Sequence, residues 1–267
     1  MGLRINQNID AINSYRNLSV TQGSMSKSLE KLSSGFRINR AADDAAGLAI
    51  SEGLRSQVGG LKVGVRNAQD GVSVAQTAEG ALTEVHSMLQ RMNDLAVQYN
   101  NGTQNTDSKT ALAAEFGQLQ TEVGRIEDNT KFNGNALFDG AAKTFQVGYS
   151  STDTIDISAT ATASFKGAIQ SLDITSATAS DDVQAQVTAV SAQRAELGAI
   201  QNRFEHTINN VNVAIENLSA SESRIRDTDM AAEMMNFTRS QVLSQAGTAM
   251  LAQANQAPQG VLQLLRG

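Results

Sequence analysis

Apolar residues recur at alternating spacings of three and four in several long segments of the chain. Near the N-terminus the repeat occupies residues 25–36, and toward the C-terminus it returns in residues 204–225. Such spacing places apolar side chains in one stripe along a helix, and the stripe needs a partner helix. We therefore expect the two ends of the chain to pair as helices, with the middle of the chain connecting them as a separate part.

Helix boundaries can be predicted from the polar and small residues between these segments. A first helix is expected over residues 3–33, ended by Gly35 in a left-handed conformation. Asp43 or Asp44 then offers an N-terminal cap to the longest helix, expected over 45–99. That helix is rich in glycine, and each helical glycine lowers stability by about 1 kcal/mol relative to alanine. Packing against other helices must therefore hold it.

Two further helices are expected near residues 108–128 and 183–225, with a turn at 130–135. Residues 141–182 differ in character, since 14 of these 42 residues are Ser or Thr. Apolar and polar residues alternate there, and alternation is typical of short strands in hairpins. A small β region is thus expected within this segment.

Together these elements predict a mainly α fold, an elongated helical bundle or coiled coil with paired terminal helices and a β-hairpin region near residues 140–180. We expect three parts. A terminal coiled-coil domain comprises residues 1–44 and 226–267. A helical bundle comprises 45–140 and 183–225, and a small β or variable region comprises 141–182.

Composition favours assembly over catalysis. Aromatic residues make up only 4% of the 267 residues, and cysteine is absent, which excludes disulfides, thiolate metal sites and cysteine nucleophiles. The net charge is −6, yet residues 1–40 carry six basic and two acidic side chains. These bases are spaced singly along an apolar-periodic helix, so we expect a solvated face or a neighbouring subunit there and no nucleic acid. No apolar run suggests insertion into a membrane, and no cleavable signal peptide is recognisable.

Candidate chemistry is sparse. His86 and His206 have no second ligand at metal-binding spacing, and the acidic pairs Asp43-Asp44 and Asp181-Asp182 fit helix capping better than acid–base catalysis. We expect no enzyme activity, no metal and no cofactor. Methionines at 230, 234 and 235 either fill space between helices or line a groove for a partner, and the sequence leaves both readings open.

Five strings resemble the bacterial flagellins. Residues 34–50 read SGFRINRAADDAAGLAI, residues 89–98 LQRMNDLAVQ, and residues 130–134 TKFNG. In the C-terminal part, residues 197–204 read LGAIQNRF and residues 245–256 QAGTAMLAQANQ. The resemblance covers about residues 1–140 and 185–267. Because only 141–182 remains between the two parts, large outer domains are expected to be missing.

The resemblance implies a subunit that polymerises with copies of itself into the flagellar filament. It also implies export through the flagellar type III apparatus to the cell exterior, with an export chaperone, a cap and hook-junction proteins as partners. The terminal segments are expected to fold only in the polymer. The residues expected to form the polymerisation seams are Ile5, Ile9, Ile12, Leu29, Leu32, Met234, Met250, Leu251, Leu264 and Leu265.

The resemblance further implies recognition by the Toll-like receptor that senses flagellin. The positions that match the family's receptor-contacting residues are Gln90, Arg91 and Leu95, with Glu115 on the next helix. Leu95 also lies on the apolar stripe of its helix, so packing is an alternative role for it.

Three other functions remain open at this point. A hook–filament junction protein shares the terminal helices but departs from the inner motifs that this chain keeps. A secreted coiled-coil binding module would have ordered termini as a monomer. A flagellin-like enzyme would need a catalytic insert, and residues 141–182 contain no histidine or cysteine.

Overall fold

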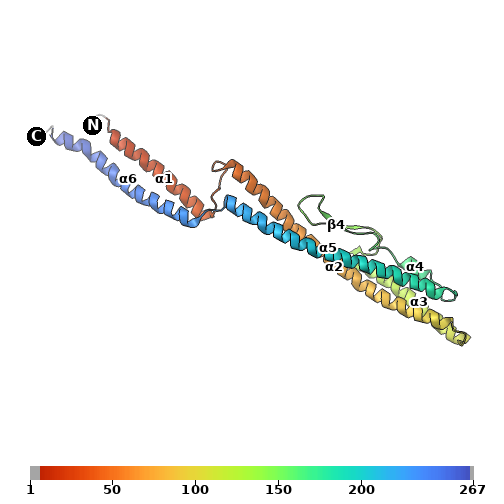
Figure 1. The fold of residues 1–267 in the computed structure, drawn as a ribbon. Coiled ribbons are helices and arrows are strands. Elements are labelled where there is room, and N and C mark those ends of the chain that lie inside the picture. The colour runs from red at the N-terminus through yellow and green to blue at the C-terminus, as the bar shows by residue number, and fades with distance from the viewer. Residues whose placement is uncertain (1–6, 265–267) are drawn as a thin grey trace. The chain divides into compact units, whose positions relative to one another are not determined.

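The computed structural model describes residues 7–264, with side chains to residue 256. Within this range it contains six helices and two pairs of short antiparallel strands (Figure 1). The helices are α1 (Ile9–Ser34), α2 (Ala45–Tyr99), α3 (Thr106–Asn129), α4 (Lys166–Gln170), α5 (Ala179–Arg226) and α6 (Met230–Leu264). The mainly α prediction, with paired terminal helices and a small hairpin region, is confirmed.

The described residues fall into two compact units. The first comprises the residues up to 56 together with those from 218 onward, and the second comprises 57–217. We call them the terminal unit and the bundle unit. α2 and α5 each contribute to both.

Local hydrogen bonds explain where α1 begins and ends and where α2 begins. The Asn8 side chain caps α1 by accepting the backbone N–H of Ala11 at 3.0 Å. Gly35 ends α1 with φ 76°, and its N–H donates to the carbonyl of Lys31 at 2.8 Å. The Asp44 carboxylate accepts the N–H of Gly47 at 2.9 Å, as expected for a cap of α2.

The core of the bundle unit is made by α2, α3 and α5 together with side chains from the segment 137–174. Their apolar stripes, read as periodic repeats in the sequence, are buried here. On α2 alone, Leu82, Val85, Leu89 and Met92 are fully buried. Close packing of this kind supplies the tertiary support that a glycine-rich helix requires.

One expectation about helix pairing was wrong. The repeat in residues 204–225 is not the partner of the N-terminal helix, because Phe204 is fully buried in the bundle unit. Its ring lies against α2, where a Cβ built on Gly71 would be 2.5 Å from Phe204 Cζ. The ring also packs edge-to-face with Phe145 at 5.6 Å. The partner of α1 is α6.

A β-hairpin formed by β3 (Lys143–Gln146) and β4 (Thr154–Ile157) packs on α2. Phe145 pairs with Ile155 in the hairpin register. A Cβ built on Gly64 of α2 would lie only 2.3 Å from the carbonyl oxygen of Val147, so the hairpin backbone approaches the helix where glycine leaves room.

The predicted turn at 130–135 is a second, smaller hairpin. β1 (Lys131–Phe132) pairs with β2 (Asn135–Ala136), and Asn133 and Gly134 connect them with φ values of 48° and 82°. Positive φ at both central residues is the signature of a type I′ turn, for which Asn-Gly is the preferred sequence.

The sequence did not predict the five-residue helix α4. It packs on α3 at three residues, Gln120, Gly124 and Glu127, which we call the α4 clamp. Glu127 accepts the backbone N–H groups of Phe165 and Lys166 at 2.9 and 2.7 Å. Gln120 donates to the carbonyls of Ile169, in the last turn of α4, and of Leu172, just after it, at 2.9 and 2.8 Å. A Cβ on Gly124 would meet Gln170 at 2.9 Å. An acceptor at the N-terminal end and a donor at the C-terminal end match the helix dipole.

Candidate interaction surfaces

Within the terminal unit, α1 and α6 lie side by side as an antiparallel pair (Figure 1). Near the start of α1, Asn8 Nδ2 donates to the backbone carbonyl of Ala254 at 2.7 Å. Beyond the end of α1, the N–H of Thr228 donates to the carbonyl of Gly35 at 2.9 Å. Both ends of the pair are thus fixed by hydrogen bonds across it.

The seam between α1 and α6 is only partly buried, with Leu18, Met25 and Leu32 on α1 and Phe237 and Leu251 on α6. Among the described side chains of the terminal unit, Ile38 is the single buried hydrophobic residue. Ordering the backbone alone opposes folding by about 1–2 kcal/mol per residue. Ile38 lies in the link after α1, and a partly buried seam does not offset that cost for two long helices, so the pair needs a further partner surface.

Large apolar side chains of α1 and α6 point to solvent instead. The most exposed include Ile12 at 63%, Met235 at 64% and Met250 at 65%. Exposed apolar area of this extent marks an interaction surface. The full set on the two helices is Ile9, Ile12, Tyr15, Val20, Leu29, Met230, Met234, Met235, Val242, Leu243 and Met250.

Most of the expected seam residues can be placed on this surface. Ile9, Ile12, Leu29, Met234 and Met250 are exposed, and two others, Leu32 and Leu251, are partly buried. Ile5 and Leu265 lie outside the described residues. Leu264 ends α6, and its side chain is not described.

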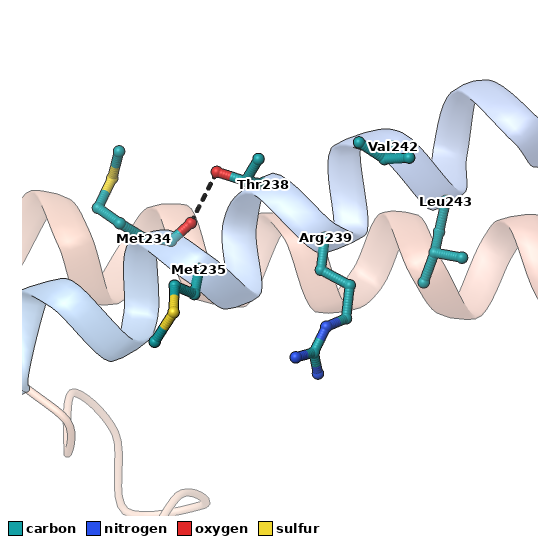
Figure 2. Close-up of a pocket in the computed structure, with 6 residues that line it drawn as sticks. All are labelled: Met234, Met235, Thr238, Arg239, Val242 and Leu243. Atoms are coloured by element: carbon teal, nitrogen blue, oxygen red, sulfur yellow. Dashed lines mark hydrogen bonds between the residues drawn. The ribbon is translucent and has the colours of Figure 1, made fainter.

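A groove of about 500 Å³ lies on α6, lined by Met234, Met235, Thr238, Arg239, Val242 and Leu243. Figure 2 shows Met235, Arg239 and Leu243 on one side of α6, at spacings of four residues, with α1 running behind. All three methionines of this segment, Met230, Met234 and Met235, are exposed and do not fill space between α1 and α6.

The link between the helices of the terminal unit is organised by Arg226. Its guanidinium lies over the Phe36 ring, 4.8 Å from the centroid, and its Nη1 is 2.5 Å from Glu52 Oε1. Its side chain is only 13% exposed, while its backbone carbonyl accepts the N–H of Arg37 at 2.7 Å. This arrangement of four residues was missed in the sequence, because Arg226 and Phe36 are far apart along the chain.

A second, charged surface lies on the bundle unit. Arg91 Nη2 on α2 is 2.7 Å from Glu115 Oε1 on α3, and both side chains are about half exposed. Gln90 is also exposed, and its Nε2 lies 3.0 Å from the His86 Nε2. Leu95 is fully buried in the bundle core, which makes it a packing residue in this fold.

No group of three or more metal-ligating side chains occurs within the part of the chain that the structure describes. Nor does any helix in that part have the length and apolar character needed to cross a membrane.

Comparison with known proteins agrees with this geometry. Residues 5–143 match the family described as the bacterial flagellin N-terminal helical region, and residues 181–265 match the bacterial flagellin C-terminal helical region. Flagellin of Halalkalibacterium halodurans is 53% identical over 98% of this chain and 99% of its own length. Flagellin of Bacillus subtilis is 47% identical over 99% of this chain and its full length.

A protein of Treponema phagedenis and a solved structure are also similar to this chain. The flagellar filament 33 kDa core protein of Treponema phagedenis is 43% identical over 98% of this chain and 99% of its own length. Among solved structures, Bacillus cereus flagellin is 30% identical, covers 59% of this chain with 94% of its own, and gives a TM-score of 0.48.

Proposed function

The chain belongs to the bacterial flagellin family, and we propose that this filament subunit polymerises through the outward faces of α1 and α6. The observation that carries the proposal is the contrast within the terminal unit. Many large apolar side chains are exposed on two helices that share a seam of only partly buried residues, with no fully buried hydrophobic side chain among those described. Copies of the same chain would cover these side chains in an open helical assembly.

Seeded polymerisation tests this proposal. A Val242→Asp substitution puts a charge into the α6 groove, where Val242 is 58% exposed, and should abolish elongation from wild-type seeds. Val213 on α5 is also 58% exposed but lies in the bundle unit, so Val213→Asp is the matched control. Normal elongation by Val242→Asp, seen by electron microscopy, would contradict the proposed role of this face.

We also propose that the chain is exported unfolded through the flagellar type III apparatus and works outside the cell. The absence of cysteine means that no disulfide has to form or be protected on the way. Weakly supported terminal helices would remain open to an export chaperone and then fold under the cap, next to the hook-junction proteins. Disabling the export apparatus should leave the protein in the cells and remove it from the medium. Undiminished secretion would argue against this route.

A third proposal concerns host recognition. The exposed Gln90, Arg91 and Glu115 form a compact polar surface across α2 and α3 that could contact the Toll-like receptor for flagellin. We leave Leu95 out of this surface because it is fully buried.

A receptor reporter assay on the monomer addresses this proposal. Arg91→Ala should reduce signalling, whereas Arg66→Ala, at another exposed arginine of α2, should not. Equal responses to the wild type and Arg91→Ala would remove Arg91 from the contact.

A further inference from the structure

The dipeptide Asn-Gly occurs twice in this chain, at Asn101-Gly102 and at Asn133-Gly134. In such a pair the glycine amide nitrogen can attack the side-chain carbonyl carbon of the asparagine, because glycine has no Cβ to obstruct the approach. All four residues are exposed. Access to water therefore does not distinguish the two sites, and the local backbone must do so.

The backbone at Asn133 opposes this reaction. Asn133 and Gly134 form the type I′ turn between β1 and β2, with φ values of 48° and 82°, and Phe132 pairs with Asn135 on either side. A left-handed residue has ψ near about +47°. That angle turns the nitrogen of the next residue to the side of Cα opposite the side chain. Gly134 N cannot reach Asn133 Cγ unless the hairpin opens.

The local structure at Asn101 does not oppose the attack of the glycine nitrogen in this way. The Asn101 side chain folds back over the peptide that follows, and its Oδ1 accepts the N–H of Thr103 at 3.2 Å. The ring closed by this hydrogen bond contains the Gly102 nitrogen, so that nitrogen and the side-chain carbonyl belong to one turn, and Asn101, unlike Asn133, has no positive φ. The bond from Thr103 also withdraws electrons from the side-chain carbonyl and makes its carbon more electrophilic.

We propose that Asn101 is a site of spontaneous deamidation, whereas the hairpin protects Asn133. Gly102 N attacks Asn101 Cγ, the new N–C bond forms, and the Cγ–Nδ2 bond breaks. The amide proton leaves with the nitrogen as ammonia, and the product is a succinimide. Water then opens the ring to aspartate or isoaspartate. Either product adds a negative charge, and isoaspartate also lengthens the backbone between α2 and α3 by one methylene.

Peptide mapping by mass spectrometry tests the proposal on the full-length protein, incubated folded at mildly alkaline pH. Conversion at Asn101 should be faster than at Asn133 by at least about tenfold, a barrier difference of about 1.4 kcal/mol. In urea the two sites should react at similar rates, since both are Asn-Gly. Gly102→Ala should slow conversion at residue 101 and leave residue 133 unchanged. Equal rates in the folded protein, or faster conversion at Asn133, would overturn the proposal.

Discussion

The carboxylate of Glu127 on α3 accepts the backbone N–H of Lys166 on α4 at 2.7 Å. The same carboxylate also binds Phe165 N–H and the Ser164 hydroxyl, and Glu127 is only 8% exposed. A charged acceptor in this position satisfies the free N–H groups at the start of α4. It ties the segment between the two flagellin-like regions to the bundle.

Removing this acceptor should loosen the segment. Glu127→Ala leaves buried N–H groups unsatisfied and should lower the free energy of unfolding by about 1–3 kcal/mol, measured by urea denaturation. Proteolysis of residues 158–178 should accelerate.

The neighbouring Asp128 provides the control for this prediction. Its Oδ2 lies 2.5 Å from Lys166 Nζ, but its side chain is 59% exposed. Asp128→Asn should change stability by less than about 1 kcal/mol, as is usual for exposed ion pairs. Equal effects of the two substitutions would show that burial at Glu127 is unimportant.

Replacing each of two glycines of α2 by alanine should change the stability of the protein in opposite directions. Gly64 faces the Val147 carbonyl oxygen, so Gly64→Ala should destabilise the protein by about 1–3 kcal/mol through overpacking. A Cβ on Gly80 meets nothing within 4 Å. Gly80→Ala should therefore stabilise the helix by about 0.5–1 kcal/mol. Thermal unfolding of the monomer measures both, and a destabilising Gly80→Ala would mean that the close-approach argument is wrong.

Arg226 should stabilise the terminal unit through its planar guanidinium as well as through its charge. Arg226→Lys keeps the charge but loses the planar group over Phe36, a contact worth about 0.5–2 kcal/mol. Filaments of this variant should depolymerise at a lower temperature than wild-type filaments. Light scattering during heating measures this temperature. Arg55→Lys is the control, because Arg55 is 68% exposed and lies 4.0 Å from the same Glu52 carboxylate.

Acid should destabilise the link between α1 and α2 at residues 39–43. The N–H of Arg40 donates to the Asp43 carboxylate and lowers the pKa of Asp43 below its ordinary value of 3.8. A carboxyl whose pKa is lower when folded stabilises the fold above the unfolded pKa and loses this effect as the pH falls through the folded value. In filaments below about pH 4, the Asn39 and Arg40 amide protons should exchange faster relative to their intrinsic rate at each pH, since their acceptor is then protonated. Asp43→Asn filaments should lack this added acceleration.

Much of the bundle could be predicted from the sequence because periodicity is a local property. The stripe through Leu82 and Leu89, the left-handed Gly35 and the Asn133-Gly134 turn each depend on neighbours within a few residues. The Arg226–Phe36 contact and the α4 clamp depend on residues brought together by the tertiary fold. The repeat around Phe204 was first assigned to the N-terminal helix for the same reason, since its apolar stripe fits any apolar surface, whereas the pairing of residues 1–44 with 226–267 agrees with α1 beside α6.

The most direct test of the account compares amide hydrogen exchange in monomer and filament. If α1 and α6 are ordered only by neighbouring copies, their amides should exchange rapidly in the monomer and become protected in the filament. Amides around Leu89, in the core of the bundle unit, should be protected in both states. Equal protection of α1 and α6 in the monomer and the filament would contradict the account, because the helical pair would then be stable without its neighbours.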